Sequence, residues 1–153
     1  MGFLDFIFGK NEYLQDAFFG KMLFLKDHKI PDNSYFECRR YFTPIKKDIE
    51  IAVTSNNLSV SEEQKVFFKK IEKDFDQFVL KIKPVIEDEF RNWKEDFKII
   101  DFKKEFAADY VTIPNLKNKP IHWEISFNSI HDLNHTFTIM MIDFEVEGIQ
   151  IDG

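Results

Sequence analysis

One long stretch of helical periodicity divides this chain into two halves that both have the pattern of β-strands. From Ser61 to Asp96, apolar residues recur every three or four positions, and Ser61 begins the stretch with a capping box that Gln64 completes. A straight helix of this length would measure about 54 Å. A compact chain of 153 residues is only about 38 Å across. The helix must therefore bend or split, and we predict the kink or break at Pro84, which lacks an N–H and clashes with the preceding turn.

The helical stretch has one apolar face and one charged face. The apolar face consists of Phe67, Ile71, Phe75, Phe78, Ile82, Ile86, Phe90, Trp93 and Phe97. The opposite face mixes lysines with acids, such as Lys70 four residues before Asp74. We therefore predict a solvated face with salt bridges there.

Segments with a two-residue period flank the helix on both sides. The predicted strands cover residues 19–26, 35–42 and 48–54 before it, and 106–113, 121–128 and 136–147 after it. Four apolar residues of the fifth strand are expected to face the helices: Ile121, Trp123, Ile125 and Phe127. The alternation slips near Met141-Ile142 and at Gly148, so bulges are predicted at these two places.

Strands grouped on either side of a helix predict a single α+β domain over residues 1–153. Its expected architecture is an antiparallel sheet, in the order three strands, two helices, three strands, with a long Pro-kinked helix or helix pair on one face. Residues 1–10 are predicted to form a short amphipathic helix that packs onto the domain, because their polar positions lack the cations of a membrane-surface helix. Cys38 lies on the apolar side of its strand and is predicted to be a core residue.

The segments that direct proteins to other compartments are missing from this sequence. No apolar run is long enough to span a bilayer, and Asp5 interrupts the apolar N-terminal run, which has no basic region before it. The one cysteine cannot form an internal disulfide, which favours a reducing compartment. We therefore expect a cytoplasmic protein without stable membrane association.

Charge is unevenly distributed along the chain. Net charge −6 argues against nucleic-acid binding, which needs clustered Lys and Arg. Residues 107–153 carry two basic and seven acidic side chains, whereas residues 1–60 carry eight of each. An acidic surface keeps a protein soluble, and it also attracts basic partners. We therefore expect that the acidic last third of the chain attracts a basic protein partner.

Motifs with a recognised chemistry do not occur in the chain. It has no phosphate-binding glycine pattern, nucleophile elbow, paired CxxC or HExxH. His122, His131 and His135 are the candidates for a metal site, but the last two flank a predicted hairpin connection, where their spacing of four has no helical meaning. We therefore predict no catalytic, cofactor-binding or metal-binding residue. Two alternatives stay open: a hydrolase or metal-dependent enzyme that uses this histidine-bearing turn, and a Phe-rich domain that binds an apolar ligand.

Several short pieces near the C-terminus carry a family resemblance. They are Ile113-Pro114, Pro120 to Trp123-Glu124, His135 to Phe137, and the terminal Ile151-Asp152-Gly153. Together with the opening MGFLDFIFGK, they resemble small uncharacterised bacterial cytosolic proteins, some of which are similar to immunity proteins that neutralise polymorphic toxins. The resemblance implies a non-catalytic protein-binding module rather than an enzyme, and it implies no catalytic residue. The form of this function that we expect is an immunity-type inhibitor of a basic toxin.

The candidate partner-binding residues are four acids of the last third. Glu124 lies on the polar side of its predicted strand, and Asp143, Glu145 and Glu147 alternate along the next one. If these two strands are neighbours, the four carboxylates form one negative patch on the open side of the sheet. Such a patch would attract a cationic partner and speed its association.

Overall fold

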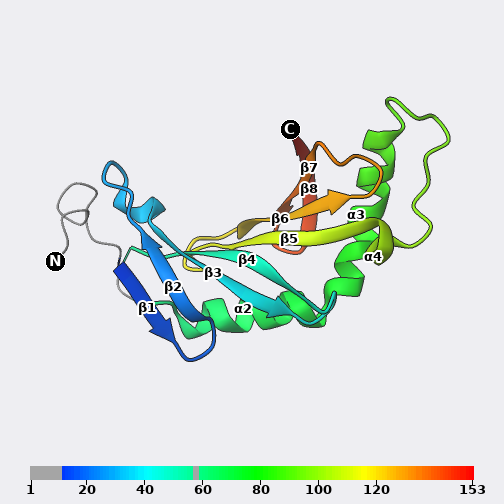
Figure 1. The fold of residues 1–153 in the computed structure, drawn as a ribbon. Coiled ribbons are helices and arrows are strands. Elements are labelled where there is room, and N and C mark those ends of the chain that lie inside the picture. The colour runs from blue at the N-terminus through cyan, green and yellow to red at the C-terminus, as the bar shows by residue number, and fades with distance from the viewer. Residues whose placement is uncertain (1–11, 57–58) are drawn as a thin grey trace, which may run out of the picture.

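Eight strands form one sheet in the order of the chain, and two helices cross from its first half to its second (Figure 1). The computed structural model describes residues 12–56 and 59–153. The strands are β1 (Glu12–Asp16), β2 (Gly20–Leu25), β3 (Tyr35–Phe42), β4 (Lys47–Thr54), β5 (Phe106–Ile113), β6 (His122–Ser129), β7 (Thr136–Ile142) and β8 (Glu145–Asp152). The helices are α2 (Glu62–Lys73), α3 (Phe75–Phe90), the short α4 (Phe102–Glu105) and a 3-10 turn, η1 (Pro31–Asn33).

The sheet consists of two four-stranded meanders joined by one parallel pair. Every neighbouring pair is antiparallel except β4–β5, where Glu50 lies opposite Tyr110 and Val53 opposite Ile113. The pair is parallel because α2 and α3 carry the chain back before β5 begins. The α+β class and the largely antiparallel sheet were therefore predicted correctly, but each half has four strands where the sequence predicted three. The polar β1 was missed.

The helical stretch splits at Asp74 rather than at Pro84, so the predicted position of the break was wrong. Asp74 has φ −99° and ψ 12°, and its N–H still bonds to the carbonyl of Lys70. Pro84 lies inside α3. The helix continues there because Pro84 and Leu80 are both exposed, so the carbonyl that loses its intrahelical partner lies on the solvent side of α3. The predicted capping box at Ser61 and Gln64 is confirmed.

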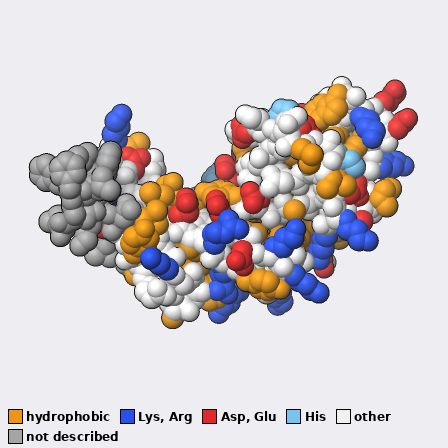
Figure 2. All heavy atoms as spheres, viewed as in Figure 1, with side chains coloured by type: hydrophobic (Ala, Val, Ile, Leu, Met, Phe, Trp, Pro, Cys, Tyr) orange, Lys and Arg blue, Asp and Glu red, His pale blue; other side chains and the backbone are white. Residues whose placement is uncertain are grey.

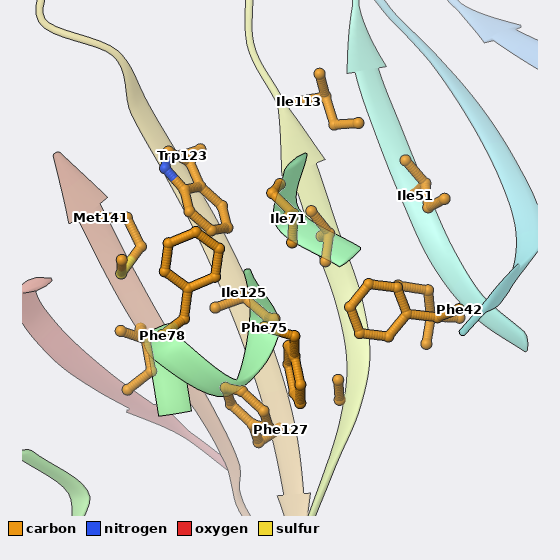
Figure 3. Packing of buried hydrophobic residues seen from close by; sticks show 14 of the residues in the cluster. Phe42, Ile51, Ile71, Phe75, Phe78, Ile113, Trp123, Ile125, Phe127 and Met141 are labelled. Carbon is orange, nitrogen blue, oxygen red and sulfur yellow. The ribbon is translucent and has the colours of Figure 1, made fainter. Parts of the chain in front are cut away.

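The core lies between the helices and one face of the sheet (Figure 3). Ile121, Trp123, Ile125 and Phe127 are all buried, as predicted. The Trp123 ring meets Phe67 of α2 edge-on at 5.6 Å and Phe78 of α3 at 5.7 Å, so β6 contacts both helices. The predicted apolar stripe is buried along α2 and α3, but Trp93 lies beyond the end of α3 and is 55% exposed.

Cys38 is also buried in this core, as predicted. Burial raises the pKa of its thiol to about 11. A thiol that remains protonated at neutral pH is a poor nucleophile.

The predicted strand over residues 136–147 is a hairpin made of β7 and β8. Asp143 turns the chain with a positive φ of 52°, which Asp tolerates better than most residues. The pairing of β7 with β8 shifts register between Met140 and Met141, opposite Gly148 and Val146. The two phase slips in the sequence therefore lie on the two sides of one irregularity in the β7–β8 pairing.

Two sequence predictions concern the ends and surfaces of the chain. The amphipathic helix predicted over residues 1–10 lies outside the described residues. Within the described residues, none of the helices has the length and apolar character required to cross a membrane.

Candidate functional site

The four predicted partner-binding acids occupy three different settings. Glu124 lies on β6 opposite Met140, on the sheet face away from the helices. Asp143 lies in the β7–β8 turn, where its Oδ1 accepts the N–H of Ile121 at 3.0 Å. Its carbonyl accepts the indole N–H of Trp123 at 2.6 Å. Asp143 therefore holds the hairpin turn against the start of β6.

Glu145 and Glu147 lie on the last strand and face different partners. Glu145 Oε1 is 2.6 Å from Lys81 Nζ on α3. Glu147 Oε2 is 3.7 Å from His122 Nδ1 at the start of β6. Each of these two carboxylates thus has a basic or titratable neighbour, whereas Glu124 lies closer to the middle of the sheet.

Glu124 belongs to a group of side chains around Tyr110, on the face of the sheet that the helices leave open. Tyr110 of β5 lies between Glu50 of β4 and Ser126 of β6. The group, which we call the Tyr110 cluster, consists of Tyr35, Glu37, Glu50, Tyr110 and Glu124. It brings together side chains from four strands, β3 to β6.

The proton of Tyr110 is held by its surroundings. Burial raises the pKa of its phenol to about 12. This value includes smaller contributions from the neighbouring Tyr35 phenol and from the carboxylates of Glu37, Glu124 and Glu50, which act in the same direction as burial. The Tyr110 hydroxyl therefore keeps its proton at neutral pH and offers a hydrogen-bond donor among carboxylates.

Positive charge near the cluster is sparse. Arg39 Nη1 lies 3.2 Å from Glu50 Oε1, but both side chains are about half exposed, so this ion pair stabilises the fold little. Within the described part of the chain, no Lys or Arg forms an ion pair with Glu37 or Glu124. The cluster thus retains unbalanced negative charge.

The surface is hollowed between the two ends of the sheet, whose open face carries the Tyr110 cluster. Figure 2 shows a depression between the β1–β2 end and the β5–β8 end of the molecule, with acidic side chains along its floor. Aromatic and apolar side chains stand on the same face, including exposed Tyr41 and half-buried Met140. Aromatic residues and Met are enriched at protein–protein interfaces. A concave face with these side chains is suited to a protein partner.

The three histidines do not meet. His122 and His131 lie at opposite ends of β6. His131 Nε2 is 2.7 Å from Glu105 Oε1, and His135 Nδ1 is 2.7 Å from Asp132 Oδ2. Across residues 12–56 and 59–153, no three His, Cys, Asp or Glu side chains come together as a metal-binding group would require.

A polar cavity of about 340 Å³ lies at the ends of β4 and β5, beside the start of α2. Its walls bond to one another: Asn56 donates to Asp32 at 2.6 Å, and buried Gln64 donates to the carbonyls of Thr54 and Pro114. Leu116 contributes the apolar part of the lining. This cavity lies outside the Phe-rich core between the sheet and the helices.

Sequence reasoning found Glu124 but missed the rest of the Tyr110 cluster. The alternation along 35–42 already placed Tyr35 and Glu37 on the polar side of their strand, and that along 48–54 did the same for Glu50. The missing information was strand order, because only the parallel β4–β5 pair brings Tyr110 beside Glu50.

Comparisons of the chain with protein-family models, curated proteins and solved structures found no match.

Proposed function

We propose that this chain is a non-catalytic protein-binding module that holds a basic partner on the open face of its sheet. The observation that carries the proposal is the Tyr110 cluster, which gathers three carboxylates and two phenols from four neighbouring strands on the open face of the sheet. A Lys or Arg side chain placed there would meet acceptors from Glu37, Glu50 and Glu124. The ring of Tyr110 adds a cation–π contact.

The proposed partner class is a basic toxin, and the proposed compartment is the cytoplasm. The resemblance to immunity-type proteins suggests this class, and the unbalanced negative charge of the cluster supports it. Inhibition by such a protein is occlusion: a tightly bound surface prevents the toxin from reaching its own target. Electrostatic attraction would speed the encounter, which matters because an inhibitor must bind before damage accumulates.

The test neutralises the cluster and measures binding of the proteins encoded beside this chain's gene, basic ones first. The variant is Glu37→Gln, Glu50→Gln and Glu124→Gln. The matched control is Glu63→Gln, Glu95→Gln and Asp96→Asn, which removes the same charge from exposed positions elsewhere. Association rates are measured between about 0.1 and 1 M salt, where the Debye length falls from about 10 to 3 Å.

The expected result is a slower association of the cluster variant, with weaker salt dependence, while the control behaves like the parent protein. If the cluster variant and the control bind alike, or if none of the neighbouring gene products binds the parent, the proposal is wrong.

A further inference from the structure

The last strand of the sheet has a free edge. β8 ends the strand order and pairs only with β7. Among the described residues, none outside β7 hydrogen-bonds to the backbone of Glu145–Asp152. Every second N–H and C=O of such a strand points sideways, away from the sheet, and can bind another strand. β8 has eight residues, whereas β1 at the opposite edge has five described ones.

β8 has two of the devices that block strand addition, which are acidic side chains and a register shift near its start. It contains no Pro and no Lys. Its register shift lies at Met140/Met141, so the stretch from Gly148 to Asp152 pairs regularly with Met140 to Thr136. This regular stretch is the part of the edge that a further strand could extend.

The side chains of this stretch define what would fit beside it. Ile149 and Ile151 are half-buried and pack against the core, on the helix side of the sheet. Gln150 and Asp152 alternate with them and are exposed, and Gln150 Nε2 donates to Asp152 Oδ1 at 3.0 Å. An added strand would therefore place apolar side chains beside the isoleucines and polar ones beside Asp152.

Charge decides between a second copy and a different partner. β8 carries Glu145, Glu147 and Asp152 and no basic residue. Pairing two copies edge to edge would bring two such sets of carboxylates together, which is unfavourable. A segment with Lys or Arg on its polar side would instead neutralise them.

We propose that β8 accepts an extended segment of a basic partner as a further strand, and that this segment alternates apolar residues with Lys or Arg. The proposal rests on the proposed function, because it takes the same basic partner and adds the sheet edge to the surface that receives it. Main-chain hydrogen bonds would give affinity, and the alternating side chains would give specificity.

The first test uses a synthetic peptide of about eight residues that alternates Val and Lys, which matches the length of a typical strand. Two further peptides carry N-methyl groups on the Val residues only or on the Lys residues only. In a strand, residues of one parity turn their N–H groups toward β8 and those of the other turn them away. One methylated peptide should therefore bind about tenfold or more weakly, since several hydrogen bonds are lost, and the other should bind nearly as the parent. Equal binding of both would overturn the proposal.

Amide hydrogen exchange of the full chain locates the peptide. Protection is expected at amides of Gly148–Asp152 and would be absent there if the peptide lay elsewhere. The variant Glu147→Lys with Asp152→Lys should lose peptide binding, whereas Glu95→Lys with Asp96→Lys, an equal charge change in an exposed loop, should keep it. A second copy of the chain is the competing occupant of the β8 edge, and sedimentation of the protein alone tests for it. A stable dimer that shields the β8 amides would contradict the charge argument.

The outcomes separate this proposal from the proposed function. If the peptide binds and the Tyr110 cluster variant loses it while β8 amides stay unprotected, basic partners occupy the open face and the β8 proposal is wrong. If no variant of either surface affects binding, both are wrong. If the peptide fails to bind at all, the β8 proposal is wrong, and the cluster is judged by the neighbouring gene products.

Discussion

Glu50 and Tyr110 lie opposite each other across the only parallel strand pair of the described sheet. Residues far apart in the chain meet here because two helices separate β4 from β5. The contact places an acid from the first meander beside a phenol from the second, and Glu37 and Glu124 complete the arrangement from the neighbouring strands. The joint between the two halves of the sheet is thus the place where negative charge gathers.

The titration of Tyr110 tests whether the cluster is as close as described. Its pKa in the folded chain is about 12, above the usual 10.0, so the unfolded chain loses this proton first. The contribution of Tyr110 to stability is therefore complete below about pH 10 and is lost as the pH rises toward 12. The phenolate absorbance of the parent protein should exceed that of Tyr110→Phe by the contribution of one tyrosine. This tyrosine should ionise at a higher pH than an ordinary phenol. A difference curve centred near pH 10 would show a well-solvated phenol.

Glu105 is predicted to stabilise the loop between β6 and β7 in its ionised form. Burial would raise its pKa, but the N–H groups of Asp101 and Ile100 and the ring of His131 outweigh burial and hold the pKa below its usual value. Its contribution is therefore present above the unfolded pKa and is lost as the pH falls through the folded one. Glu105→Gln should lower the free energy of unfolding by about 1–3 kcal/mol at neutral pH.

Denaturant titrations at neutral and acidic pH check this prediction. The penalty of Glu105→Gln should shrink on acidification, because the parent then also loses the carboxylate. Glu95→Gln, at an exposed position, serves as the control and should change little at either pH. A penalty that is constant across pH would mean that the charge of Glu105 is irrelevant to stability.

Trp123 is predicted to be the most costly aromatic side chain to remove from β6. It is 2% exposed, contacts both long helices, and donates its indole N–H to the carbonyl of Asp143. Trp123→Ala should reduce the free energy of unfolding by about 3–5 kcal/mol, as large aromatic truncations in cores do. An unchanged denaturation midpoint would place this side chain outside the core.

Pro84 offers a substitution that should stabilise the chain. Since α3 runs through it, Pro84→Ala restores an N–H for the carbonyl of Leu80 and removes a steric conflict. The expected gain is about 1–3 kcal/mol in the free energy of unfolding. The same substitution at a helix break would have little effect, so a neutral result would favour the break that the sequence predicted.

Local patterns predicted local structure well, and they failed where partners are distant. The bounds of β3 and β5 match the predicted segments. Turn residues flank β3 on both sides, and Pro114 ends β5. β1 was missed because its five residues include Glu12, Gln15 and Asp16 and show no clear apolar period. The helix break at Asp74 has no proline to signal it.

The candidate site was only partly predictable for the same reason. Alternation shows which side chains of one strand share a face, and it does not show which strands are neighbours. Asp143 and Glu124 have similar sequence surroundings, yet one carboxylate holds a turn and the other lies on the open face. Because the chain turns at Asp143, Glu145 and Glu147 lie on the edge strand β8 and not on the same strand as the residues before the turn.

The proposed function requires a basic protein partner to bind on the open face of the sheet around Tyr110. Backbone and side-chain NMR shifts of the full chain, recorded with and without a basic product of the neighbouring genes, test it most directly. The largest changes are expected at Tyr35, Glu37, Tyr110 and Glu124, with little change at the exposed sides of α2 and α3. Changes confined to those helices, with the Tyr110 cluster unaffected, would contradict it.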